Sequence, residues 1–219
     1  MRDLNSVTLD VCEMFRSIQG ESTYAGLPCV FVRLTGCNLR CRYCDTGYAY
    51  EEGRKLSISS IIHRVDELGG GLVEVTGGEP LLQPATPTLL FALAESGRRV
   101  LLETNGTLLL PEVRPYHVIM DLKCPGSGQS EKTEWRNLEL LQAGDEIKFV
   151  IWDRADFDWA VETILTRELD GAGLPLLFSP VAGKIEPERL AEWVLATGLP
   201  LRLQLQLHKL IWPGRERGV

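Results

Sequence analysis

Short apolar runs alternate with amphipathic segments through most of this chain of 219 residues. The runs have the length and composition of β-strands, and several of the segments between them have the length and periodicity of helices. Strands joined by such crossovers run parallel with right-handed connections. The pattern therefore predicts an α/β fold, either a doubly wound sheet or a complete or partial barrel. The expected strands are 29–34, 72–75, 99–103, 117–122, 146–151, 174–178 and 201–205, and the expected helices are 58–68, 86–96, 155–168 and 187–197.

No feature of the sequence divides the chain into separate domains. It holds no internal repeat, no low-complexity tract and no linker of sufficient length. We therefore predict a single domain over residues 1–219. Within it, residues 1–28 are expected to form an N-terminal extension, 29–200 the core, and 201–219 a C-terminal strand and tail.

The charge balance argues against two classes of partner. The chain has 30 acidic and 23 basic side chains, a net charge of -7 and a pI near 5.1. Such a balance opposes binding to nucleic acid or to an anionic membrane surface. No segment approaches the roughly 20 apolar residues of a membrane span, and residues 1–10 lack the apolar core of a secretory signal. We expect a cytoplasmic protein with no nucleic-acid or membrane partner.

The six cysteines are unevenly distributed. Cys37, Cys41 and Cys44 lie close together directly after the predicted strand 29–34, whereas the other three stand alone. Thiolates at C-x3-C-x2-C spacing bind soft metals, but a closed zinc site or a fully ligated cluster takes four protein ligands, and no fourth lies nearby. Two possibilities stay open. One is a structural zinc site with a distant fourth ligand; the other, which the spacing favours, is a four-iron cluster with three cysteine ligands and one open iron.

Three further polar clusters also follow predicted strands. They are Thr-Gly-Gly-Glu-Pro at 76–80, Glu-Thr-Asn-Gly at 103–106 and Asp-Leu-Lys at 121–123. The carboxyl ends of parallel strands meet on one rim of the fold, so these clusters and the cysteine loop should face a common pocket.

The cysteine spacing resembles that of the radical S-adenosylmethionine superfamily, and the likeness extends from Cys29 onward. The resemblance implies that Cys37, Cys41 and Cys44 hold a [4Fe-4S] cluster whose open iron binds S-adenosylmethionine, which is cleaved to a 5′-deoxyadenosyl radical. It also implies a partial barrel of six βα units. Residues 106–114 and 125–134 are short for full helical crossovers, so we expect a trimmed (β/α)6 barrel.

An ordered set of motifs narrows the resemblance to the 7-carboxy-7-deazaguanine synthase family. The similar segments, which cover nearly the whole chain, are FRSIQGE at 15–21, the run 26–46, ETN at 103–105, DLK at 121–123, EIKFV at 146–150 and QLQLHK at 204–209. The resemblance implies a carbon-nitrogen lyase that contracts the ring of 6-carboxy-5,6,7,8-tetrahydropterin, giving 7-carboxy-7-deazaguanine and ammonia on the route to queuosine. S-adenosylmethionine is regenerated in that reaction.

The resemblance also implies the roles of individual residues. Those expected at the substrate are Ile18, Gln19, Gly20, Glu21, Arg33, Thr76 and Pro213. Those expected at S-adenosylmethionine are Tyr43, Gly78, Glu79, Glu103, Thr104, Asn105, Asp121, Leu122, Lys123, Lys148, Ser179 and Pro180. Thr46 is expected to contact Mg2+, and no side chain is assigned as a catalytic acid or base. Arg33 could instead form a structural ion pair, and Thr46 could be an ordinary turn hydroxyl.

Two other functions remain as alternatives. A small radical activase would use the same cluster on a glycine of a partner protein, and a non-catalytic module would keep an iron-sulfur cluster or another metal without chemistry. For the ring-contraction reaction we expect an electron donor such as flavodoxin or ferredoxin. We also expect a homodimer, because a second subunit would cover the exposed sheet edges of a trimmed barrel.

Overall fold

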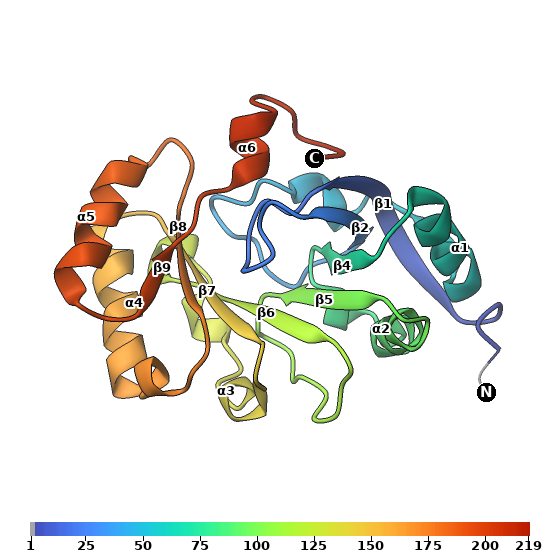
Figure 1. Cartoon of the computed structure of the whole chain (residues 1–219), viewed down its shortest axis with the longest axis horizontal. Helices are drawn as coiled ribbons and strands as arrows, with labels where there is room; N and C mark the ends of the chain where they lie inside the picture. Colours follow the sequence, from blue (N-terminus) through green and yellow to red (C-terminus); the bar gives the residue numbers. More distant parts are fainter. Residues whose placement is uncertain (1–2) are drawn as a thin grey trace.

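One sheet organises the structure, a computed structural model that describes residues 3–219. In that range nine strands follow the order β3-β1-β2-β4-β5-β6-β7-β8-β9 (Figure 1). The strands are β1 (Thr8–Ile18), β2 (Pro28–Leu34), β3 (Arg54–Ser57), β4 (Leu72–Gly77), β5 (Arg99–Thr104), β6 (His117–Leu122), β7 (Glu146–Ile151), β8 (Leu176–Pro180) and β9 (Leu201–Leu203). The helices are α1 (Ile58–Leu68), α2 (Thr86–Glu95), α3 (Asn137–Leu140), α4 (Arg154–Thr166), α5 (Pro187–Thr197) and α6 (Leu207–Ile211). Single 3-10 turns lie at η1 (Gly47–Tyr50), η2 (Pro80–Leu82), η3 (Pro125–Ser127), η4 (Ser130–Lys132) and η5 (Leu169–Gly171).

Strand β2 and the six strands from β4 to β9 form the parallel part of the sheet, as the alternating pattern predicts. At the other end of the sheet, β1 pairs antiparallel with both β2 and β3. Within the described residues β3 and β9 are the two edges and do not pair with each other, so the barrel is open. The predicted α/β partial barrel is confirmed.

The sequence pattern does not predict strands β1 and β3. Charged residues at Asp10, Glu13 and Arg16 interrupt the apolar pattern of β1, so the segment does not read as a buried strand. Its partners are also remote, because Thr8 pairs with Ser57 and Ile18 with Pro28. Much of the expected N-terminal extension is thus an 11-residue strand of the sheet.

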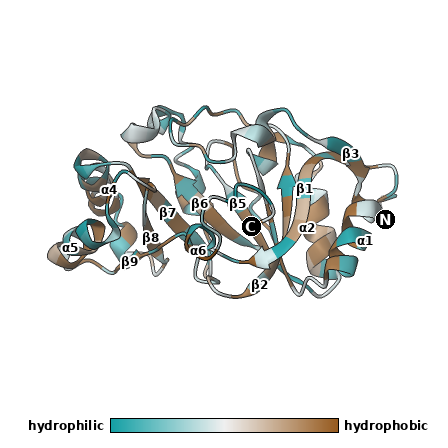
Figure 2. Ribbon diagram, turned by 90° about the horizontal axis from the view of Figure 1, so that it is seen from above, coloured by the Kyte–Doolittle hydropathy of each residue, from teal (hydrophilic) through white to brown (hydrophobic). Residues whose placement is uncertain are grey.

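Helix α1 shows how local sequence and packing agree. The Ser57 hydroxyl accepts a hydrogen bond from the Ser60 N–H at its start, and Gly69 ends it in the left-handed conformation at φ 74°. Ile58, Ile61 and Val65 form its buried face against the sheet. In Figure 2 most strands in the middle of the molecule are hydrophobic, whereas the helices carry both hydrophobic and hydrophilic residues.

The connections on either side of β6 lack a full crossover helix, as expected for a trimmed barrel. No regular helix lies between β5 and β6 among the described residues, and the crossover from β6 to β7 contains only η3, η4 and the four-residue α3. Helix α6 and the residues after it cross above the sheet (Figure 1).

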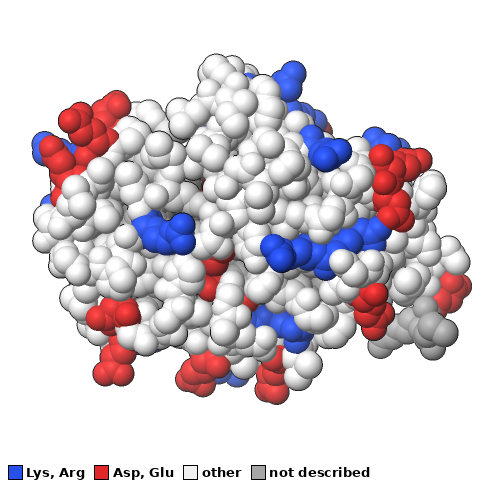
Figure 3. All heavy atoms as spheres, in the orientation of Figure 1, with Lys and Arg blue, Asp and Glu red and all other residues white. Residues whose placement is uncertain are grey.

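On the face drawn in Figure 3, one band of basic side chains lies right of the centre and the other basic side chains form small separate groups. Acidic side chains lie mainly toward the edge, with a few near the centre. Among residues 3–219, no helix combines the length and apolar character that a membrane span requires.

Candidate active site

A cavity of about 740 Å³ lies at the carboxyl ends of the parallel strands. The loops after β1 and β2, the ends of β4 to β7, and helix α6 with the tail all line it. The predicted site residues that line it are Ile18, Gln19, Gly20, Glu21, Arg33, Cys37, Cys41, Tyr43, Cys44, Thr46, Thr76, Gly78, Glu103, Thr104, Asn105, Asp121, Lys123 and Lys148. Strand-end clusters far apart in sequence therefore face one space.

The three cysteines of the loop after β2 are free thiols on the wall of this cavity. The Leu39 N–H lies 3.4 Å from the Cys37 sulfur and donates to it, and the Asn105 Nδ2 lies 3.9 Å from the same atom. Among residues 3–219, no group of three or more His, Cys, Asp or Glu side chains is arranged around a single metal ion. The three thiols nevertheless line the same cavity.

Gly77 and Gly78 let two strand-end loops approach closely. Gly77 has φ 151°, and a Cβ on it would lie 2.2 Å from the Leu34 carbonyl oxygen. A Cβ on Gly78 would lie 2.1 Å from the Gly36 carbonyl oxygen. The glycine pair thereby brings the end of β4 against the start of the cysteine loop.

Glu79 does not line the cavity. Its side chain is completely buried, and its carboxylate accepts from Leu81 N–H at 2.9 Å, Asn105 N–H at 2.7 Å and the Thr104 hydroxyl at 2.9 Å. Burial raises its pKa, and these donors oppose that shift. In this state Glu79 holds the end of β5 and the turn after β4 in place, and its expected contact with S-adenosylmethionine stays a prediction.

Lys148, in the middle of β7, is the centre of a buried charge network. Its side chain is 5% exposed, and its Nζ lies 2.8 Å from Glu21 and 3.6 Å from Asp121 and is also paired with Glu103. Asp121 pairs in addition with Lys123 at 2.7 Å. Three carboxylates and two ammonium groups therefore meet on one wall of the cavity.

The pKa of Glu21 shows how strongly this network favours charge. Burial raises the pKa, but the Lys148 ammonium and the hydrogen bonds from Lys148 and Gln206 outweigh burial and lower it to about 2. Gln206 Nε2 lies 2.6 Å from the second carboxylate oxygen. Glu21 is therefore ionised at neutral pH and held from two sides.

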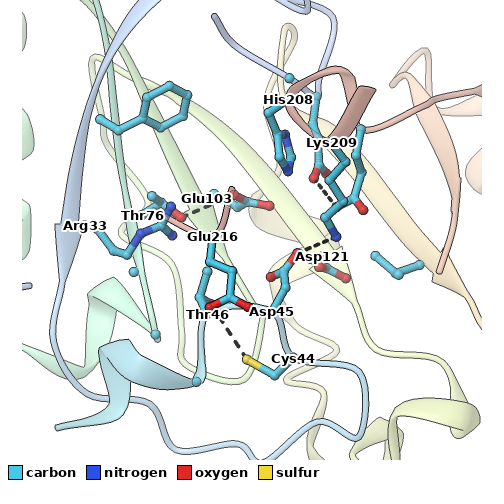
Figure 4. Close-up of a pocket in the computed structure, with 18 of the residues that line it drawn as sticks. Arg33, Cys44, Asp45, Thr46, Thr76, Glu103, Asp121, His208, Lys209 and Glu216 are labelled. Carbon is cyan, nitrogen blue, oxygen red and sulfur yellow. Dashed lines mark hydrogen bonds and ion pairs between the residues drawn. The ribbon is translucent and has the colours of Figure 1, made fainter. Parts of the chain in front are cut away.

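A second polar group joins β1, β2 and η1. The Arg33 Nε–H donates to Glu13 at 2.8 Å, and the Tyr48 hydroxyl donates to the same carboxylate at 2.7 Å. The ion pair considered as an alternative for Arg33 is present, and the guanidinium lines the cavity as well. Figure 4 shows Arg33 beside Thr76 and Glu103, with His208 and Lys209 of α6 across from them.

Several cavity residues were not identified from the sequence. Glu74, Tyr48 and His208 line it, as do Gln206 and Lys209. Their signals are weak because Glu74 sits within an apolar strand, and the others come from segments whose path depends on tertiary packing. The contact between Lys209 and Asp45, at 2.6 Å, ties α6 to the cysteine loop. Residues 214–217 of the tail also line the cavity.

Four other expected contacts lie outside the lining. The Leu122 side chain is buried in the core. Ser179 and Pro180 are buried at the end of β8, directly before the lining residue Val181. Pro213 lies between Trp212 and Gly214, which line the cavity although Pro213 does not. The expected contacts of these four residues with substrate or S-adenosylmethionine stay predictions.

Comparisons with known proteins agree with this geometry. Residues 31–120 match the family model of the Radical SAM superfamily. A 7-carboxy-7-deazaguanine synthase of Koribacter versatilis is 44% identical and aligns over 96% of this chain and 100% of its own length. A protein of the same name from Chlorobaculum tepidum is 48% identical over 96% of this chain and 97% of the relative.

A solved structure is similar in fold. The crystal structure of QueE from Escherichia coli has a TM-score of 0.76 to this chain and 24% sequence identity. The similarity covers 93% of this chain and 96% of that one. This similarity shows that the two chains share a fold.

Proposed function

The chain belongs to the 7-carboxy-7-deazaguanine synthase family of radical S-adenosylmethionine enzymes, and we propose that it contracts the ring of 6-carboxy-5,6,7,8-tetrahydropterin to 7-carboxy-7-deazaguanine with loss of ammonia. This reaction belongs to the synthesis of 7-deazapurines such as queuosine. One observation carries the proposal: a single cavity is lined both by three free thiols and by the charge network around Lys148. A radical source and a small polar substrate can therefore meet in one space.

The donor set suits a [4Fe-4S] cluster with S-adenosylmethionine. Cys37, Cys41 and Cys44 would hold three irons and leave one for the cofactor, and the N–H groups directed at the Cys37 sulfur are of the kind that stabilise a cluster thiolate. When bound, this pair supplies the radical that removes a hydrogen atom from the substrate. The protein's own groups bind and orient. Tyr43, Gly78, Thr104, Asn105, Asp121 and Lys123 are proposed to line the cofactor region.

The substrate region is proposed to lie between β1, β2 and β7. Arg33 offers a guanidinium to the substrate carboxylate, and Thr76 lies beside it on the neighbouring strand. Ile18, Gly20 and Glu21 form the opposite wall, and Lys148 and Glu103 link the two regions. The buried charges hold these groups in place before the substrate arrives, which limits the reorganisation required for reaction.

Magnesium is proposed at Thr46. Its hydroxyl lies 3.7 Å from the Cys44 sulfur and faces the cavity, with Asp45 next to it. A hydroxyl oxygen, substrate oxygens and water are ligands of the kind that Mg2+ takes. Measuring activity after chelation and after addition of Mg2+ or Ca2+ tests this assignment.

The location of α6 favours a small substrate over the glycine of a partner protein. Leu207 N–H donates to the Gly20 carbonyl at 3.0 Å, and Lys209 pairs with Asp45. The helix thus connects two sides of the cavity, where an activase would need a wide entrance. The activase is not favoured.

Three further properties complete the proposal. We propose a homodimer, because β9 is an edge strand and Leu203, Leu210 and Ile211 near it are exposed. We propose a cytoplasmic location, with which six free cysteines are compatible. An electron donor such as flavodoxin or ferredoxin is proposed to reduce the cluster.

The test of the proposed function is an anaerobic assay. The protein is reconstituted with iron and sulfide, supplied with reductant and S-adenosylmethionine, and given the carboxytetrahydropterin. Formation of the deazaguanine product without stoichiometric consumption of S-adenosylmethionine is the expected result. Consumption with no product would contradict the proposal and favour a different radical reaction.

A further inference from the structure

Glu74 is a buried carboxyl group on the cavity wall to which no role has yet been given. It lies in the middle of β4 and is 3% exposed, yet it is among the residues that line the cavity. Strand geometry places it on the same face as Thr76, two residues further along. A carboxyl group at this depth needs hydrogen-bond donors, because burying it without them is costly.

The protein provides only part of what this carboxyl group needs. Within the described residues, its hydrogen bond comes from Gln19 Nε2 and uses Oε2. Oε1 therefore remains for a ligand in the cavity. Burial and the nearby Glu103 carboxylate raise the pKa of Glu74 well above its usual range, and Glu21 adds to this shift. A ligand that brings N–H donors would relieve the unfavourable surroundings.

Gln19, in turn, is occupied by the protein. Its Nε2 donates to Glu74, and its Oε1 accepts from the Glu21 N–H at 3.0 Å. The Gln19 backbone also exchanges two hydrogen bonds with Leu27 and Gly26, each at 2.8 Å, which fixes the loop. These bonds make Gln19 a positioning residue for Glu74, and its expected contact with the substrate stays a prediction.

The surroundings of Glu74 suit a flat ring. Phe31 is the register partner of Glu74 on β2 and lines the cavity, and its ring stacks on Phe15 with centroids 5.0 Å apart. Ile119 on β6 lines the same part of the cavity. A rigid aromatic face beside a buried carboxyl group is an arrangement that binds a planar heterocycle by its face and by one edge.

We propose that Glu74 recognises the adjacent N–H donors of a 2-amino-4-oxo heterocycle, that is, the exocyclic amine and ring N–H of a pterin. This inference rests on the proposed function for the identity of the heterocycle. Within the described residues Oε1 has no protein donor, and Oε2 keeps a second lone pair beside the Gln19 bond, so the carboxylate can accept two parallel hydrogen bonds from such an edge. Glu74 would therefore select substrates that carry the 2-amino group over analogues that lack it.

The test uses Glu74→Gln and measures binding without turnover. Gln keeps the size of the side chain, and its amide oxygen can still accept from Gln19. Its NH2 group then faces the N–H donors of the ligand, so an attractive contact becomes a donor-donor conflict. Glu146→Gln is the matched control, since Glu146 is also a buried strand carboxyl with a pKa raised by burial, but it accepts from Thr23 outside the cavity lining.

Dissociation constants are measured by calorimetry on anaerobic protein that carries its cluster and S-adenosylmethionine, without reductant. The probes are the carboxytetrahydropterin, pterin, and pteridin-4-one, which lacks the 2-amino group. Wild type should bind pterin about 10-fold or more tighter than pteridin-4-one. Glu74→Gln should weaken binding of both 2-amino compounds by about 10- to 100-fold, and should weaken pteridin-4-one less, because that probe keeps the ring N–H but lacks the 2-amino group. Glu146→Gln should resemble wild type.

The outcomes separate this inference from the proposed function. If wild type forms the deazaguanine but Glu74→Gln binds all three probes as wild type does, the role of Glu74 is wrong. Equal binding of pterin and pteridin-4-one by wild type would overturn it as well. If wild type forms no deazaguanine yet prefers pterin, and Glu74→Gln abolishes the preference, the proposed reaction fails and the recognition by Glu74 stands.

Discussion

Replacing Lys148 with Met should destabilise the protein in a strongly pH-dependent way. The ammonium lies 2.8 Å from Glu21 and 3.6 Å from Asp121, with Glu103 also in contact. At an effective dielectric constant of about 20, attraction at the shorter distance is about 6 kcal/mol before the cost of desolvation. Removing one partner of a buried pair costs about 3 to 5 kcal/mol net, so we expect a loss of that size near pH 7.

The sign of the pH dependence follows from Glu21. In the wild type its pKa is lowered to about 2, so its ionised form stabilises the fold above the unfolded pKa, and this contribution is lost only as the pH falls through about 2. Without Lys148, burial would instead raise that pKa. The variant should then regain stability relative to wild type as the pH falls from 7 to 5, because protonation removes the uncompensated charge.

Urea unfolding, followed by circular dichroism at pH 7 and pH 5, measures both effects. A Lys148→Met/Glu21→Gln double variant should recover part of the loss. Lys55→Met is the control, because Lys55 pairs with Asp10 at 3.0 Å but is 67% exposed, and its loss should cost less than about 1 kcal/mol. A loss below about 1 kcal/mol for Lys148→Met, or an equal loss at both pH values, would refute the account of the charge network.

Three further variants test other parts of the structure. Gly20→Ala would place a Cβ 2.2 Å from His208 Nδ1, so it should displace α6, increase cleavage near the C-terminus in limited proteolysis and weaken substrate binding. The double variant Gly20→Ala/His208→Ala should return α6 to its place and cleavage to the wild-type level. Unchanged proteolysis in Gly20→Ala would count against the contact. Glu79→Gln replaces a buried carboxylate that accepts three hydrogen bonds with an amide, and should lower the free energy of unfolding by about 1 to 3 kcal/mol. Urea titration measures this change, and an unchanged free energy of unfolding would disprove the prediction. Glu74→Gln should be at least as stable as wild type at pH 7. Because the pKa of Glu74 is raised in the folded state, ionisation of Glu74 destabilises the fold as the pH rises above the pKa of a glutamate in the unfolded chain. The advantage of the variant should vanish near pH 4, and a variant less stable than wild type at pH 7 would contradict this.

The sequence predicted the parallel part of the fold well, because each strand there is an apolar run. The predicted ranges 117–122 and 146–151 coincide with β6 and β7. Helix 58–68 coincides with α1, where a serine cap and a terminal glycine mark both ends. The mixed pattern of β1 hid a strand whose partners, at 28–34 and 54–57, lie elsewhere in the chain.

The candidate site was predictable where residue type alone carries the chemistry. The cysteine spacing and the polar strand ends located the cavity, because parallel strands bring those ends together. The state of each side chain was not predictable. Glu79 and Glu74 are both acidic residues of β4 or its end, but one is saturated by backbone N–H groups and the other keeps an oxygen for a ligand. Only packing distinguishes them.

Mössbauer spectroscopy of protein reconstituted anaerobically with 57Fe tests most directly whether one iron is left open by the three cysteines. We expect a four-iron cluster in which one iron is distinct and changes its isomer shift when S-adenosylmethionine is added, while Cys37→Ala, Cys41→Ala and Cys44→Ala each lose the cluster. Four equivalent irons that do not respond to S-adenosylmethionine, or a protein that retains a single zinc ion in place of iron, would rule out an open iron site.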